Sequence, residues 1–146
     1  MQKKPRIGAH VPTSGGMAKR SIEYAVTTQS EAIQVFASNP RGWAMPDPNP
    51  EADKAFREKC EELDIKSYVH APFLINLGSP TPSTYENSLA STAYSLKRAK
   101  EIGALGTVIH TGSAVDESHV DNAWKDRKST RLNSSHVALS RMPSSA

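Results

Sequence analysis

Short apolar runs alternate with amphipathic helical patterns between Arg6 and His110, and this alternation limits the folds open to the chain. Four runs have the length and the flanking turn residues of buried strands, at residues 6–11, 32–36, 66–70 and 107–110. Helical spacing of apolar residues fills the intervals between them. Strands that alternate with helices in this way predict a parallel sheet with crossover connections.

The number of predicted strands suits half of a barrel. A (βα)8 barrel closes with twice as many strands and takes about 250 residues, whereas this chain has 146. We therefore expect an α/β fold, the N-terminal half of a (βα)8 TIM barrel with about four parallel strands, over residues 1–125. A half barrel exposes strand edges and an apolar interior, so self-association of the isolated chain is expected.

The sequence also predicts where the second and third helices begin. Asn49 is suited to cap a helix whose first residue is Pro50. Ser83 and Glu86 have the spacing of a capping box for the third helix. The residues of the third helix expected to face the sheet are Leu89, Ala93, Leu96 and Ile102.

Two histidines close apolar runs in consecutive strand–helix units. His70 ends the run 66–70 and His110 ends the run 107–110. Side chains at the carboxyl ends of barrel strands meet on one face, and neighbouring strands lie about 4.8 Å apart, so both imidazoles could reach one metal site. A single histidine at a strand end is more often a hydrogen-bonded structural residue. The spacing alone leaves both interpretations open.

The last residues do not continue the pattern of the domain. Residues 126–146 have no apolar period and are rich in Ser and Arg. They resemble, codon for codon, a translated sequencing-library adapter, which indicates a non-native tail that is expected to be disordered and to lie outside the fold. A native basic tail is the alternative interpretation.

This exclusion removes the basic character of the chain. The net charge of +3 comes from 18 basic and 15 acidic residues. The tail contains four of the basic residues and one acidic residue, which leaves 14 of each in residues 1–125. The overall charge is therefore no evidence for a nucleic-acid partner, and DNA binding would need local contacts.

Cysteine content and hydropathy bear on the compartment. The chain has a single cysteine, Cys60, which rules out an internal disulfide. No apolar run approaches the roughly 20 residues of a membrane span. We expect a cytoplasmic protein with no membrane partner.

Several segments in order resemble endonuclease IV, the zinc-dependent deoxyribonuclease that acts at abasic sites and has a xylose-isomerase-like barrel. The most specific is Leu-Ile-Asn-Leu-Gly at 74–78, directly after the strand that ends in His70. Asn-Pro-Arg-Gly-Trp at 39–43 is next. Gly-Ala-His at 8–10 is less specific, because sugar-isomerase barrels share it. The resemblance extends from about Ile7 to about Ser113.

The resemblance implies roles residue by residue. His70 and His110 match zinc ligands of a trinuclear site. Arg41, Phe73 and Leu74 match positions that push into DNA at the abasic nucleotide; the family usually has Tyr in place of Phe73. This chain has Ala114 where the family often has a second histidine. The remaining ligands and the catalytic glutamate would lie beyond Lys125.

Each candidate also has a simpler interpretation. His10 is expected to be structural rather than a ligand, and Trp43 to pack within its loop. Asn76 is expected to order its own loop by local hydrogen bonds. Arg41 could be a surface ion-pair partner. Phe73 and Leu74 could simply cover the mouth of the barrel.

The expected function of the full-length protein is zinc-dependent hydrolysis of the phosphodiester 5′ to abasic sites in double-stranded DNA, as part of base excision repair. The full-length protein is expected to be monomeric. A metal-dependent sugar-isomerase-like barrel acting on a small polyol is the alternative enzyme. The third possibility is a non-catalytic fragment, and it describes this 146-residue chain best if most ligands are missing.

The tail gives the first testable prediction. Deleting residues 126–146 should leave the free energy of unfolding unchanged, because the segment has no apolar face to bury. Urea denaturation of the shortened and the complete chain measures this. A clear loss of stability in the shortened chain would show that the tail belongs to the fold.

Overall fold

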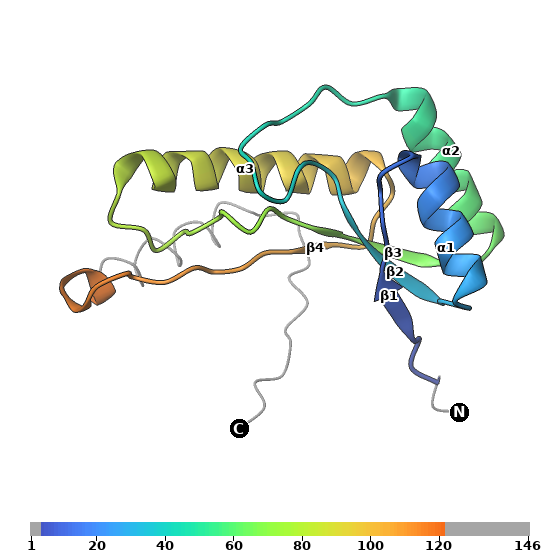
Figure 1. Ribbon diagram of the computed structural model, residues 1–146, viewed down its shortest axis with the longest axis horizontal. Coiled ribbons are helices and arrows are strands. Elements are labelled where there is room, and N and C mark those ends of the chain that lie inside the picture. Colours follow the sequence, from blue (N-terminus) through green and yellow to red (C-terminus); the bar gives the residue numbers. More distant parts are fainter. Residues whose placement is uncertain (1–3, 122–146) are drawn as a thin grey trace.

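The computed structural model describes residues 4–121, and Figure 1 shows strands and helices in alternation. The predicted tail lies outside the described residues. The strands are β1 (Gly8–His10), β2 (Ala32–Phe36), β3 (Lys66–His70) and β4 (Thr107–Val108). The helical segments are η1 (Gly16–Ser21), α1 (Ile22–Thr27), α2 (Pro50–Glu62), α3 (Pro82–Glu101) and the short turn η2 (Glu117–His119).

The strands form one parallel sheet in the order β1-β2-β3-β4. This confirms the predicted α/β half-barrel topology. β2 and β3 have the predicted bounds, whereas β1 and β4 are shorter than the apolar runs that predicted them. Within the described residues these two strands pair on one side only, so fewer hydrogen bonds extend them. His110 therefore lies two residues beyond the end of β4.

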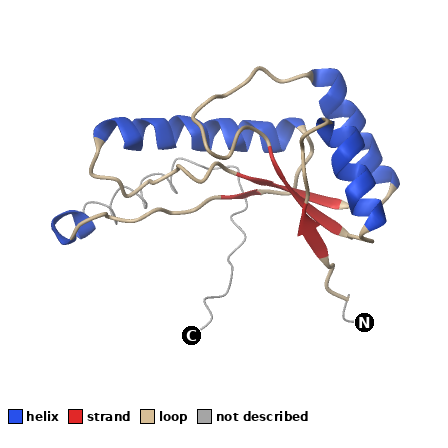
Figure 2. Cartoon of the chain, viewed as in Figure 1, coloured by secondary structure: helices blue, strands red, loops and turns tan. Residues whose placement is uncertain are grey.

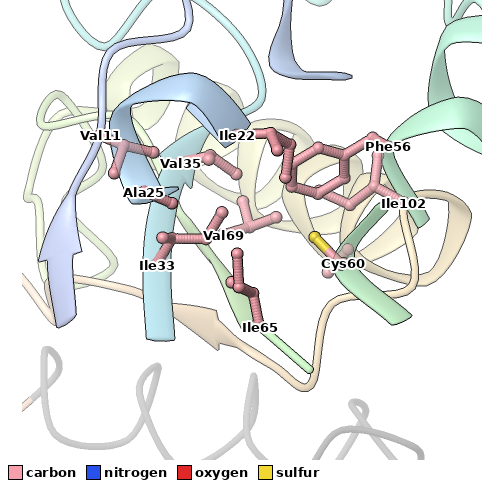
Figure 3. Close-up of a cluster of buried hydrophobic side chains, with 11 residues drawn as sticks. Val11, Ile22, Ala25, Ile33, Val35, Phe56, Cys60, Ile65, Val69 and Ile102 are labelled. Atoms are coloured by element: carbon pink, nitrogen blue, oxygen red, sulfur yellow. The ribbon is translucent and has the colours of Figure 1, made fainter. Parts of the chain in front are cut away.

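The two faces of the sheet differ in burial. On β2 and β3, buried residues alternate with half-buried ones, as the two-residue period of a strand requires. Ile33, Val35 and Val69 are buried on the face that packs against the helices, with Ile22 of α1 and Phe56 of α2 (Figure 3). Cys60 belongs to the same cluster, and burial raises the pKa of its thiol to about 11.

The helix starts test the capping predictions. Asn49 caps α2 as predicted: its side-chain oxygen accepts a hydrogen bond from the Ala52 N–H at 3.1 Å. The predicted Ser83–Glu86 capping box is wrong. α3 begins at Pro82 and its N-cap is Thr81, which makes no side-chain cap bond. Proline fits the first turn because it needs no hydrogen-bond acceptor there, so the helix begins before the capping pair.

The buried side of α3 is built of small polar residues rather than the predicted leucines and alanine. Ala93 is exposed and Leu89 only half-buried, whereas Ile102 is buried just beyond the end of the helix. The Ser88 and Ser95 hydroxyls donate to the carbonyl oxygens of Thr84 and Ser91, one turn earlier, so they are buried without loss of hydrogen bonding. The buried residues of α3 are Ser88, Ser91, Thr92, Ser95, Arg98 and Ala99.

A buried ion pair joins α3 to α2. Arg98 donates two hydrogen bonds to the Asp53 carboxylate, at 2.6 and 2.7 Å, and a third to Glu101 at 2.6 Å. Arg98 and Asp53 are 5% and 3% exposed. The two-pronged geometry compensates the desolvation of both charges and fixes the spacing of the two helices.

The long loops follow the carboxyl ends of the strands. Figure 2 shows the loops after β3 and β4 running side by side along α3. The loop after β2 joins them, since the Phe73 N–H donates to the Pro40 carbonyl oxygen at 2.9 Å. Within residues 4–121, no helix combines the length and apolar character needed to cross a membrane.

Replacing Arg98 should destabilise the fold strongly. Arg98→Met leaves the buried Asp53 carboxylate without its cation, which should cost about 3–5 kcal/mol. Lys97→Met is the matched control, because Lys97 lies on the same helix, is exposed, and approaches Glu101 only at 3.8 Å; its loss should cost about 0.5 kcal/mol or less. Urea denaturation compares the two variants, and equal midpoints would contradict a stabilising role for the buried pair.

Candidate metal and nucleic-acid site

Three histidine rings gather at the carboxyl edge of the sheet. His10 ends β1, His70 ends β3, and His110 follows β4. The ring centroids of His70 and His110 lie 5.1 Å apart, and those of His10 and His70 lie 5.9 Å apart. The parallel pairing of the strands produces this meeting, which brings together the two histidines predicted from sequence.

Two phenylalanine rings enclose His70. Phe36 at the end of β2 is paired with His70 in the strand register, and their ring centroids are 5.1 Å apart. Phe73, from the loop after β3, lies 5.4 Å from His70 and 6.3 Å from His110. The edge-to-face contacts place apolar ring surface around the imidazole and exclude water from part of it.

His70 is held in a form suited to metal binding. Its Nδ1 lies 2.6 Å from the Ala71 carbonyl oxygen, which accepts a hydrogen bond and so assigns the proton to Nδ1. Burial lowers the pKa of His70 below 6.5, while the bond to Ala71 opposes the shift and His110 and His10 add to it. The neutral ring then presents the Nε2 lone pair, as a metal-bound histidine does.

His10 has a different partner. Its Nδ1 lies 3.0 Å from the side-chain oxygen of Gln34, the residue opposite it on β2. This contact anchors His10 to the neighbouring strand, in line with the structural role expected for it. The sequence analysis assigned Gln34 and Phe36 no role in the site, although strand alternation places both on the half-buried face of β2.

Two of the gathered histidines have donor chemistry that suits a metal ion. Neutral imidazoles suit zinc, and the donor chemistry of His70 and His110 fits that ion. Within residues 4–121, however, His, Cys, Asp and Glu side chains do not assemble into a group of three or more that could hold an ion. A complete site would need further ligands.

Phe73 and Leu74, two of the residues expected to push into DNA as a wedge, lie beside His110. Phe73 and Leu74 are 52% and 38% exposed, in the loop that follows the carboxyl end of β3. They line an open cavity of about 400 Å³ together with His110, Asn76 and Gly112. Arg41 is exposed on the adjoining loop, and within the described residues its side chain forms no ion pair.

Trp43 is a half-buried packing residue, as expected. It contacts the buried cluster of Ala71, Ile75 and Leu77. This cluster belongs to the loop after β3, so Trp43 supports that loop. The simpler interpretation of Trp43 as a packing residue is the one that the structure supports.

Comparisons with known proteins agree with this geometry. A family model described as "Xylose isomerase-like TIM barrel" matches residues 22–134. A protein of Streptomyces coelicolor named "Probable endonuclease 4" is 53% identical over 108 residues, which are 74% of this chain and 37% of that protein. Its counterpart in Streptomyces avermitilis is also 53% identical, over 35% of its length. The chain thus spans little more than a third of these relatives.

Solved structures give the same result. The crystal structure of endonuclease IV from Thermus thermophilus matches with a TM-score of 0.71 and 31% identity, over 88% of this chain and 47% of that one. A D-tagatose 3-epimerase-like protein matches with a TM-score of 0.60 at 16% identity, which shows a shared fold alone. The chain belongs to the xylose isomerase-like TIM-barrel family. Within it, the matches confirm the resemblance to endonuclease IV.

The environment of His70 predicts a measurable pH dependence. In metal-free buffer, NMR titration of the His70 ring should give a pKa below the ordinary 6.5, because burial disfavours the charged ring. Below pH 6.5 the His70 ring is protonated more fully in the unfolded chain than in the folded chain. The free energy of unfolding should therefore fall as the pH falls. Phe73→Ala, which exposes the ring, should bring the pKa back toward 6.5. A pKa of 6.5 or above in the unmodified chain would contradict this description of the site.

Proposed function

We propose that this chain is part of a zinc-dependent endonuclease that hydrolyses the phosphodiester 5′ to abasic sites in DNA. The proposal rests on one observation: the imidazoles of His70 and His110 lie close together beside the exposed ring of Phe73. The names of the relatives support a nuclease, and the abasic substrate and the zinc are part of the proposal.

His70 and His110 would hold the metal. Bound metal ions would supply a nucleophile at neutral pH and neutralise charge on the phosphoryl group. The contribution of the chain itself is to keep His70 neutral and oriented, through burial between Phe36 and Phe73 and through its hydrogen bond to Ala71. Further ligands and a general base are proposed to come from residues outside this chain.

Phe73, Leu74 and Arg41 would hold the DNA. An apolar side chain acts as a wedge by separating stacked bases, and this action needs no net positive charge on the protein. A phosphate or a base edge would pair with the exposed guanidinium of Arg41. The exposed apolar side chains of Phe73 and Leu74 favour DNA as the substrate over a small polyol, because a sugar-binding site would need polar groups at these positions.

The 146-residue chain alone is proposed to be inactive, because catalytic zinc sites use at least three protein ligands. It should bind zinc weakly and should not cut DNA. Robust incision by this chain would overturn the proposal that most of the machinery lies elsewhere.

The full-length protein tests the ligand and wedge assignments separately. His70→Ala and His110→Ala should lower the zinc content and reduce incision of an abasic duplex. The loss of activity should exceed roughly 100-fold, because losing a residue that only supports a metal ligand already costs roughly 10–100-fold. At slightly alkaline pH, where the His70 ring is neutral with or without Phe73, Phe73→Ala should retain zinc. It should weaken binding to abasic DNA by about 1–3 kcal/mol, the usual contribution of an aromatic that stacks on a base.

The controls separate chemistry from folding. Tyr24→Ala removes an exposed aromatic from α1, away from the site, and should change neither zinc content nor DNA affinity. Zinc content by mass spectrometry and incision of a labelled duplex are the measurements. If both histidine variants kept their full zinc content and cut DNA normally, the assignment of His70 and His110 as metal ligands would be wrong.

A further inference from the structure

Asn76 lies where the loop after β3 meets the loop after β4. Its side-chain oxygen accepts two backbone hydrogen bonds, from the N–H of Gly78 at 3.0 Å and from the N–H of Ser113 at 2.9 Å. The first bond orders its own loop, as the sequence predicted. The second reaches across to a residue 37 positions away. Asn76 therefore links the loop that carries Phe73 to the segment that carries His110.

Asn76 is itself anchored to α3. Its backbone N–H donates to the Ser88 hydroxyl at 2.9 Å, and that hydroxyl donates to the Thr84 carbonyl oxygen at 2.6 Å. Ser88 is fully buried. The position of the Asn76 oxygen is thus set by the first part of a long helix rather than by a flexible loop.

Gly112 permits the close approach of the two loops. Its backbone has a φ of +77°, and a Cβ placed there would lie 1.9 Å from the Asn76 side-chain oxygen and 2.6 Å from its Cα. A side chain at position 112 would therefore collide with Asn76. Only glycine combines this backbone conformation with this proximity.

The segment around His110 is fixed at two points. On one side, the Val108 carbonyl oxygen accepts a hydrogen bond from the Ala71 N–H at 2.9 Å. On the other side, the Ser113 N–H donates to Asn76. His110 lies between these two bonds and is exposed, so packing alone holds its ring weakly.

We propose that Asn76 is a positioning residue that holds His110 against His70 by clamping the loop after β4 at Ser113. For metal binding, the proposal rests on the proposed function, because His70 and His110 are the ligands that the clamp would bring together. Asn76 lines the same cavity as His110, yet its oxygen is engaged by two amides. Its role is therefore to set the separation of the two rings.

The first experiment uses the metal-free 146-residue chain. NMR should show a cross-relaxation signal between the ring protons of His70 and His110, and slow exchange of the Ser113 amide. Asn76→Ala should weaken the ring signal and speed Ser113 exchange at least tenfold. Asn76→Asp keeps an acceptor oxygen in place and should preserve both. Asn49→Ala is the matched control, because it removes an equivalent oxygen-to-amide bond at the start of α2, on another part of the fold.

Zinc affinity then measures the consequence. Relative to the unmodified chain, Asn76→Ala should bind zinc about tenfold more weakly, the lower end of the loss seen for outer-shell partners. Asn49→Ala should bind zinc as the unmodified chain does. Gly112→Ala is the second variant if Asn76→Ala does not fold, since it displaces the loop after β4 while the Asn76–Gly78 bond remains; it should have the same effects as Asn76→Ala.

Two results would overturn the clamp: unchanged Ser113 exchange in Asn76→Ala, or faster exchange with unchanged ring proximity and zinc affinity. The second result would make Asn76 a loop residue with no effect on the histidines. If the ring signal depends on Asn76 while His70→Ala and His110→Ala of the full-length protein keep their full zinc content, the metal assignment fails and the positioning role stands. The two hypotheses therefore fail separately.

Discussion

Parallel hydrogen bonding between neighbouring strands is the constraint on which the site depends. Because the strands run in the same direction, their carboxyl ends share one edge, and the residues that end them become neighbours. The register pairs Phe36 with His70 and His70 with Val108. A shift of one residue would turn His70 toward the helices and place Val69 on the open face. The register thus decides which side chains meet.

The helix side of the sheet keeps this register in place. Valine and isoleucine from the strands fill one continuous cluster with residues of α1 and α2. Against β3 and β4, α3 contributes serines and an alanine, whose small volume allows the helix to lie close to the strands. The Arg98–Asp53 pair then joins α3 to α2. The open face can therefore carry polar and aromatic groups without loss of the core.

Sequence predicted the features that depend on local pattern. Residue spacing predicted three features that the structure has: the bounds of β2 and β3, the Asn49 cap, and the convergence of His70 and His110. The predicted buried face of α3 was wrong except at Ile102, because burial there depends on how closely the helix approaches the sheet. The Asn76–Ser113 bond joins residues distant in sequence and has no local signal. Enclosure of His70 by Phe36 likewise depends on strand pairing.

The hydrogen bond from the Phe73 N–H to the Pro40 carbonyl oxygen has a consequence for how such loops can diverge. It ties the loop that carries Arg41 to the loop that carries Phe73 at a fixed separation. An insertion or deletion between Phe36 and Pro40, or between His70 and Phe73, would break this bond unless the other segment changed to match. The lengths of these two segments should therefore vary together among related sequences, and grafting either loop alone into another barrel should not transfer its shape.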